Sequence, residues 1–300
     1  MTNEPYSKCP SCRGTLTFWR SKTVGEHTYR IDSCTECGYS FVNPRPSFDF
    51  LMEYYSSYGH SHDEVIRSAP SFEKVMESEK ANPNSTLDAK RIVATLNKLG
   101  LSGGGRTFLD VGCGYGFFSK AAIQAGFQVT AIELAEQERA IARKNCGIVA
   151  QSCSYESFSN EAVLFDVVLM SQILEHALDV NQWLKKTREM MNDSGVLVIA
   201  LPNFNSIFRR ILQENESFIS PPAHLNFFSP KSLSNLLQRH GYIVEETQWV
   251  SRIPSTSFER RLPSFAKPLL PVIQGASEAA LKCIDTLHMG MIINVYARKI

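Results

Sequence analysis

The sequence lacks an excess of charge of either sign. Its 31 lysines and arginines balance 30 aspartates and glutamates, which gives a formal net charge of +1. A chain so close to neutrality creates no long-range field that would attract a nucleic acid or an anionic membrane. Any polyanion would therefore have to bind a local basic patch.

Long hydrophobic runs are also lacking. No apolar stretch approaches the roughly 18 residues that would cross a bilayer, and the start, MTNEPYSKCP, is too polar for a signal peptide. The sequence therefore predicts no membrane span and a cytoplasmic location. In that reducing compartment the 8 cysteines are not expected to form disulfides, which leaves metal binding or burial.

Four of the cysteines form two Cys-x2-Cys pairs that are separated by 21 residues, close to the spacing of four-thiolate zinc sites. The stretches 16–19 and 27–31 between the pairs are typical of short hairpin strands. We therefore expect a zinc ribbon over residues 1–43. Because a closed four-thiolate site leaves no position open for a substrate, the zinc would be structural. The expected ligands are Cys9, Cys12, Cys34 and Cys37.

A glycine-rich turn stands near the middle of the sequence, in the stretch FLDVGCGYGFF. Residues 107–110 are typical of a buried strand and 117–125 of a helix, and Gly112, Gly114 and Gly116 crowd the turn between them. Such a unit brings backbone and a helix N-terminus close to a nucleotide-type ligand. The dinucleotide fingerprint would need a glycine at Phe117, so the pattern does not fit a nicotinamide cofactor.

Two carboxylates narrow the class of ligand. Asp110 ends the predicted strand, where it would repel a pyrophosphate but suits a ligand with an ammonium group and a sulfonium, as in S-adenosylmethionine. Glu133 follows 23 residues later, at the end of the strand-like run 127–134. There it is placed to accept hydrogen bonds from both ribose hydroxyls.

In these residues the sequence resembles the class I S-adenosylmethionine-dependent methyltransferases. Asp110 and the three glycines match the first motif of that family, and Glu133 matches the acidic residue that ends its second strand. The resemblance covers residues 87–300, with 165–170 similar to the fourth strand and 195–203 to the fifth. It implies an α/β fold with a doubly wound, mostly parallel seven-stranded sheet, the Rossmann-like methyltransferase fold, preceded by the small zinc ribbon.

The same resemblance implies a set of contacts with S-adenosylmethionine. Asp110 would hold the ammonium group and Glu133 the ribose. Cys153 or Ser154, at the end of a poorly marked third strand, would touch the adenine. The methionine portion would be held by the turn and the fourth strand, at Gly112, Gly114, Met170 and Ser171.

Three further segments are expected to surround this site. Residues 44–86 form a linker, whose aromatic stretch 48–58 either lines a lid over the cofactor or packs as an interdomain helix. The insertions 203–228 and 251–290 leave the core where parallel strands carry their carboxyl ends. Ligands of open α/β sheets bind at that edge, so the insertions should build the acceptor pocket.

Two histidines are candidates for proton transfer, because a neutral imidazole can accept the proton that an acceptor oxygen or carbon loses. His224 lies in the first insertion, in a run that often faces the acceptor in similar proteins. His176 follows Glu175, where ubiquinone-type relatives carry a Glu-x-x-Glu-His pattern implicated in divalent metal binding. Gln172 replaces the first carboxylate here, which disfavours a metal-assisted reaction. A purely structural role is the alternative for both histidines.

Five arginines in the insertions could bind a phosphate on the acceptor, or they could be solvated side chains. They are Arg209, Arg210, Arg252, Arg260 and Arg261.

The sequence thus predicts methyl transfer to an oxygen or carbon of a small molecule, such as a sugar or secondary metabolite. Two alternatives stay open, a nucleic-acid methyltransferase that binds through the ribbon and a non-catalytic cofactor-binding module. The nearly balanced charges of the ribbon disfavour nucleic acid.

Overall fold

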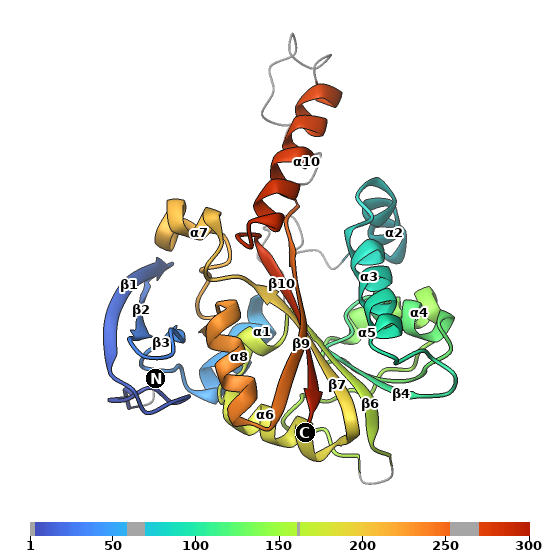
Figure 1. The fold of residues 1–300 in the computed structure, drawn as a ribbon, viewed down its shortest axis with the longest axis horizontal. Helices are drawn as coiled ribbons and strands as arrows, with labels where there is room; N and C mark the ends of the chain where they lie inside the picture. Colours follow the sequence, from blue (N-terminus) through green and yellow to red (C-terminus); the bar gives the residue numbers. More distant parts are fainter. Residues whose placement is uncertain (1–3, 59–69, 161–162, 253–269) are drawn as a thin grey trace.

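The computed structural model describes residues 4–58, 70–160, 163–252 and 270–300, with backbone alone at 52, 55–58 and 270–274. Its centre is a six-stranded sheet in the order β5-β4-β6-β7-β10-β9 (Figure 1). β5, β4, β6 and β7 run parallel, and β10 is antiparallel to both β7 and β9. The strands are β4 Thr107–Val111, β5 Gln128–Ile132, β6 Phe165–Ser171, β7 Met191–Pro202, β9 Tyr242–Val250 and β10 Ile292–Lys299.

This arrangement confirms the predicted mostly parallel α/β sheet but differs from it by one strand. In place of the poorly marked third strand, the described chain has a single parallel bridge between Gln151 and Ile132. Only three apolar residues, Ile148, Val149 and Ala150, precede the polar stretch that begins at Gln151. This apolar run is too short to support a longer ladder of hydrogen bonds with β5.

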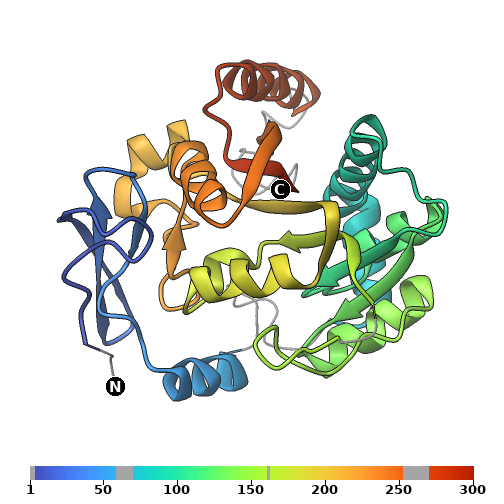
Figure 2. The same cartoon turned by 60° about the horizontal axis from the view of Figure 1, so that its bottom comes forward.

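Side chains alternate between the two faces of the sheet, and helices cover both faces (Figures 1 and 2). Phe108 and Val167 belong to the cluster that includes α3 Asn84–Lys98 and α4 Phe117–Gln124. Their neighbours Leu109 and Val168 pack on the other side. The helices there are α6 Val180–Glu189 and α8 Pro230–Arg239.

The expected hairpin of the ribbon is present, with longer strands than its apolar stretches suggest. β1 Leu16–Val24 pairs with β2 His27–Cys34, which pairs with β3 Ser40–Val42. The fourth strand of this sheet is β8 Asn226–Phe227, which comes from the insertion at 203–228. The head of the chain and the acceptor insertion therefore form one sheet.

The head also shares its hydrophobic core with the main sheet. Cys9, Tyr39 and Phe41 belong to the same buried cluster as Phe228 and Leu233. The rings of Tyr39 and Phe228 stack with their centroids 5.1 Å apart. The boundary that the sequence suggests at residue 43 is therefore not a boundary in packing.

The described part of the linker is mainly helical. Its helices are α1 Phe48–Tyr58 and α2 Phe72–Ala81, and α3 begins directly after Asn82 and Pro83. After β6 the chain forms the short 3-10 turn η2 Leu174–His176 before Asp179 caps α6. After β5 the chain forms α5 Glu136–Cys146.

The described parts of both insertions lie at the edge where the parallel strands end. The first follows β7 and contains α7 Ile207–Leu212, η3 Gln213–Asn215 and β8. The second joins β9, which runs parallel to β7, to β10, and its helix α10 Leu270–Thr286 projects from the body (Figure 1). Arg260 and Arg261 lie outside the described residues.

Candidate active site

A cavity of about 370 Å³ opens where β4, β5 and β6 end. The strand ends contribute Gly112, Glu133 and Ser171 to its wall. α1 covers one side with Phe48, Leu51 and Tyr54, and the first insertion adds Ala223 and His224. The cavity therefore joins several of the predicted cofactor residues to the two predicted catalytic histidines, His176 and His224.

The glycine turn is tight for two different reasons. Gly112 has a φ of +66°, and a Cβ there would lie 2.2 Å from Cδ1 of Ile173, so this glycine lets the turn pack against the loop after β6. Gly116, with a φ of +77°, begins α4, and its Cβ would lie 3.1 Å from Cβ of Ala142 on α5. Gly112 lines the cavity, whereas Gly114 and Gly116 shape the turn behind it.

Glu133 lies at the carboxyl end of β5, as predicted, and its carboxylate is held by backbone. Oε2 accepts a hydrogen bond of 3.0 Å from the Gly114 N–H, and Oε1 accepts one of 2.9 Å from Ala135 N–H. The side chain lines the cavity while only 7% of the residue is exposed. One carboxylate thus fixes the glycine turn and faces the space where a ribose would lie.

Asp110 occupies a different place from the one its predicted role requires. It is 1% exposed, it is not among the residues that line the cavity, and its Oδ2 accepts a 2.6 Å hydrogen bond from the Ser119 hydroxyl. Burial raises its pKa to about 6, although the bond from Ser119 opposes the rise. In this structure Asp110 ties the end of β4 to α4.

The cavity is lined by more carboxylates than the sequence suggested. Glu138 on α5 and Glu156 join Glu133 in its wall. Burial, with a smaller contribution from the charge of Glu133, raises the pKa of Glu138 to about 7. Glu138 was missed although it lies five residues after Glu133, in the first turn of the following helix. An acidic wall suits a positively charged ligand.

Of the remaining predicted cofactor residues, some line the cavity and one does not. Ser154 and Ser171 line the cavity, as does Cys153, while Met170 is fully buried beneath it. Tyr54 also lines the cavity, which supports a covering role for α1. The side chains of Tyr55 and Tyr58 lie outside the described residues.

The two candidate histidines lie side by side in the structure. His176 contacts Ala223, the residue before His224, although the two are 47 residues apart in the sequence. Their rings are edge to face with centroids 4.9 Å apart, and both line the cavity. Nδ1 of His176 lies 2.8 Å from the Ala223 carbonyl oxygen, and Nδ1 of His224 lies 2.8 Å from that of Phe218. Because a carbonyl only accepts, each Nδ1 carries the hydrogen, and Nε2 is the nitrogen that can accept a proton.

Glu175 lies beside this histidine pair. The residue is 1% exposed, and neither carboxylate oxygen has a hydrogen-bond partner among the described residues. Burial raises its pKa to about 8. Ligand atoms of Glu175, His176 and His224 lie within 4.8 Å of one another, so these three could hold a metal ion. Gln172, by contrast, donates to the Ala200 carbonyl oxygen at 3.3 Å.

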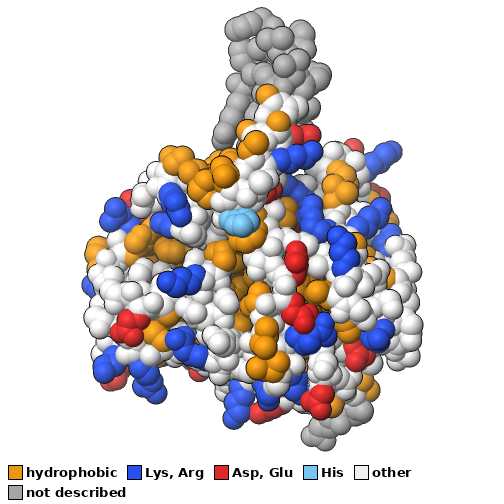
Figure 3. Space-filling view, viewed as in Figure 1, with side chains coloured by type: hydrophobic (Ala, Val, Ile, Leu, Met, Phe, Trp, Pro, Cys, Tyr) orange, Lys and Arg blue, Asp and Glu red, His pale blue; other side chains and the backbone are white. Residues whose placement is uncertain are grey.

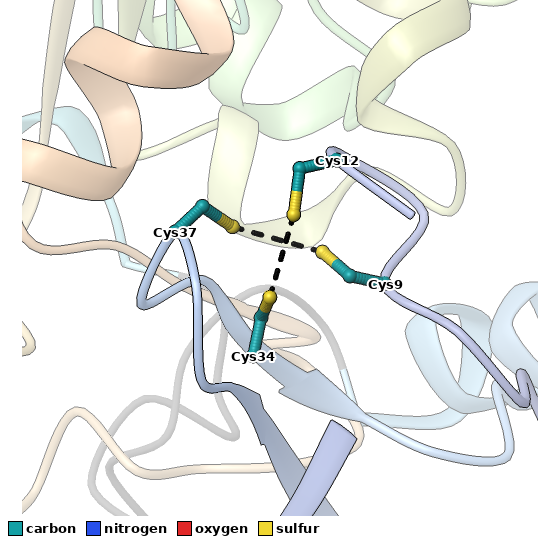
Figure 4. Close-up of side chains that lie close together, drawn as sticks. All are labelled: Cys9, Cys12, Cys34 and Cys37. Carbon is teal, nitrogen blue, oxygen red and sulfur yellow. Dashed lines mark hydrogen bonds between the residues drawn. The ribbon is translucent and has the colours of Figure 1, made fainter. Parts of the chain in front are cut away.

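A second group of residues that could hold a metal is the predicted cysteine set. In Figure 4 the four side chains point toward one another from two separate turns. Sγ of Cys9 lies 3.7 Å from that of Cys37, and Sγ of Cys12 lies 3.4 Å from that of Cys34. Tetrahedral zinc with bonds of about 2.3 Å needs sulfurs about 3.8 Å apart, so the cluster fits this ion.

The two cysteine turns have matching backbones. Arg13 N–H donates to the Cys9 carbonyl at 2.8 Å, and Gly38 N–H donates to that of Cys34 at 3.0 Å. Arg13 and Gly38 both have positive φ, +65° and +73°. This repeated turn directs both pairs of thiols to one point.

The described arginines of the insertions serve the fold. The Arg209 guanidinium lies over the Phe204 ring at 4.4 Å and donates to the Phe204 carbonyl. Arg252 pairs with Asp88, and Arg210 donates to Asn205 at 2.9 Å. None of the three is among the residues that line the cavity, so they give the phosphate hypothesis no support.

Comparison with known proteins places the chain in a family. Residues 85–247, more than half of the chain, match the family described as "Methyltransferase domain", and the chain belongs to it. Among curated proteins, a "Ubiquinone biosynthesis O-methyltransferase" from Caulobacter vibrioides is 30% identical over 105 residues, 33% of this chain and 42% of that protein. The protein of the same description from Methylocella silvestris is 33% identical over 104 residues, 33% of this chain and 41% of that protein. The chain thus matches less than half the length of either.

A solved structure supports the same fold. Magnesium protoporphyrin IX methyltransferase from Synechocystis PCC 6803, which has bound SAH, aligns with a TM-score of 0.55 and 13% identity. The alignment covers 85% of this chain and 100% of that one. It confirms the Rossmann-like methyltransferase fold. Within the described residues, no helix has both the length and the apolar character to cross a membrane.

Proposed function

We propose that the chain transfers a methyl group from S-adenosylmethionine to an oxygen or carbon of a small molecule, such as a sugar or secondary metabolite. The observation that carries the proposal is the cavity that joins Glu133 and the glycine turn to the pair His176 and His224. The names of the similar curated proteins favour an oxygen acceptor.

The residues of the cavity divide into two groups that fit the two ligands. Glu133 would accept hydrogen bonds from the ribose hydroxyls, Gly112 and Ser171 would contact the methionine portion, and Ser154 the adenine. The wall of Glu133, Glu138 and Glu156 favours the positive charge of the donor. Asp110 would act on the donor indirectly, since it holds the turn through Ser119.

The bound donor supplies a methyl carbon activated by the sulfonium. The acceptor atom would form its new bond to that carbon while the carbon–sulfur bond breaks and its electron pair leaves with the thioether, so the residues of the chain would mainly orient the two ligands. The acceptor proton would pass to Nε2 of His224 or of His176, which line the same cavity. Nδ1–H bonds to backbone carbonyls hold both rings in the tautomer that this transfer needs.

We also propose a structural zinc at Cys9, Cys12, Cys34 and Cys37, supported by the convergence of the four thiols. A small molecule is favoured over nucleic acid, because the face in Figure 3 intersperses basic with acidic side chains.

Calorimetric titration with S-adenosylmethionine tests the cofactor assignment, and the isolated nicotinamide cofactor NAD serves as the control ligand. We expect S-adenosylmethionine to bind and NAD not to bind. Glu133→Ala should weaken the binding of S-adenosylmethionine by about 2 to 3 kcal/mol, the loss typical of hydrogen bonds to a charged group. Glu133→Gln, which keeps one acceptor oxygen, should lose less. Unchanged affinity in Glu133→Ala would remove the ribose assignment. Mass spectrometry of extracts incubated with an isotopically labelled methyl donor would then identify the acceptor.

A further inference from the structure

We propose that Arg45 is a positioning residue for the pair His176 and His224. Through Arg45, the small sheet β1-β2-β3-β8 would belong to the acceptor site. The geometry that points to this is one hydrogen-bond network from Arg45 to the backbone on both histidine segments. The inference rests on the proposed function only for the kinetic part of its test.

Arg45 is a buried cation held by neutral groups. It is 3% exposed, and none of the ion pairs between described residues includes it. Burying a charge without a counter-ion is costly unless hydrogen bonds replace its hydration. The guanidinium therefore depends on its acceptors, and the segments that carry those acceptors are held in place by it.

Two of its three acceptors directly follow His224. Nη1 donates to the Leu225 carbonyl at 2.8 Å, and Nη2 donates to Oδ1 of Asn226 at 2.6 Å. Nη2 also donates to the Tyr39 hydroxyl at 2.9 Å, and that hydroxyl itself donates to Asn226. Arg45 thus fixes the chain within two residues of His224.

The same two residues hold the segment around His176. Nδ2 of Asn226 donates to the carbonyls of Glu175 and Ala177 at 3.1 and 2.7 Å. Leu225 N–H donates to the Glu175 carbonyl at 2.8 Å. Residues 225 and 226 are therefore bonded to Arg45 on one side and to both neighbours of His176 on the other.

Strand pairing connects this network to the cysteines. Phe41 on β3 pairs with Asn226 on β8, and Val42 N–H donates to the Leu225 carbonyl at 3.0 Å. β3 begins three residues after Cys37. A shift of the cysteine turn would therefore be passed through β3 and Arg45 to the histidines.

Arginine suits this role better than lysine. Its planar fork presents several N–H donors at fixed angles, whereas lysine keeps the charge but offers a single flexible ammonium. Arg45→Gln should displace the histidine pair, and a misplacement of about 1 Å at a reacting group can lower turnover by up to about 100-fold. Arg45→Lys should lose less.

The test compares Arg45→Gln and Arg45→Lys with Arg20→Gln in the full-length protein. Arg20 is a matched control because it lies on β1 of the same sheet, where its exposed side chain pairs with Glu214 at 3.4 Å. Nitrogen NMR of the imidazoles, assigned with His176→Gln and His224→Gln, reports the geometry without any reaction. Calorimetry with S-adenosylmethionine checks that the cofactor half is intact.

We expect the His176 and His224 signals to move in Arg45→Gln, to move less in Arg45→Lys, and to stay in place in Arg20→Gln. Once an acceptor is known, kcat should fall about tenfold to 100-fold in Arg45→Gln with cofactor affinity unchanged. Unmoved imidazole signals in Arg45→Gln or, if that variant does not fold, in Arg45→Lys would overturn the proposal. Absence of methyl transfer in the wild type would contradict the proposed function, while the NMR comparison would still decide the role of Arg45.

Discussion

The buried carboxyl group of Asp110 should make the free energy of unfolding depend on pH. Its folded pKa of about 6 lies above the 3.8 of the free group because burial disfavours the charge. The folded chain therefore keeps a proton that the unfolded chain releases. Its contribution to the free energy of unfolding should fall as pH rises from about 4 to about 6 and then stay constant.

Urea unfolding of the wild type and Asp110→Asn between pH 5 and 8 measures this effect. The wild type should lose stability relative to the variant up to about pH 6, by at most about 1.4 kcal/mol per pH unit. Asparagine can still accept the Ser119 bond, so the comparison isolates the charge. A stability difference that does not vary with pH would show that Asp110 titrates normally.

The histidine pair also makes its prediction at the residue scale. As a general base His224 would contribute about 10² to 10⁴ in rate, so His224→Ala should lower kcat by that factor with the affinity for S-adenosylmethionine unchanged. His176→Ala should lower it too, and the double variant should lose less than the product of the two effects, because the rings act together. His240→Ala, at the end of α8 and bonded to Asn181, is the control. Near-normal turnover in His224→Ala would return that residue to a structural role.

At the scale of elements, the turn after β4 is fitted to the loop after β6. Gly112→Ala should weaken S-adenosylmethionine binding for two reasons, strain of about 1 kcal/mol or more at positive φ and a clash that pushes Ile173 toward the cavity. Ile173→Val alone removes the clashing Cδ1 and should change affinity little. Combined with Gly112→Ala, it should restore part of the lost affinity, as calorimetry would show. No recovery in the double variant would mean that backbone strain alone matters.

How far the sequence predicts the elements depends on how local their causes are. The glycine turn, Glu133 and the cysteine pairs follow from spacing, and the structure places each at the expected strand end or turn. The weak third strand, the burial of Asp110 and the meeting of His176 with His224 depend on packing between distant segments. No local pattern of residues encodes that packing. Glu138 is the exception, since its position five residues after Glu133 could have indicated it.

At the scale of the whole molecule, the ribbon and the main sheet should unfold together. The protein should contain about one zinc per chain, and Cys34→Ser should lose it. Cys9, Cys34 and Cys37 belong to the same hydrophobic cluster as buried residues of the main sheet. The variant should therefore show one cooperative unfolding transition, at a lower temperature than the wild type. Metal analysis and scanning calorimetry measure both effects. Two separate transitions, with the upper one unchanged, would show instead that the zinc ribbon unfolds independently of the main sheet.

The joining of β3 to β8 also bears on how the protein is made. Tyr39 and its partner Asn226 are 187 residues apart, a span that a ribosome covers in about 10 to 40 s. During that time the cysteines can already take up zinc, yet β3 has an unpaired edge that could join other chains. β3 therefore leaves the ribosome well before β8 and stays incomplete until β8 has followed it. Chaperone capture or a slow phase in synthesis would act on this interval.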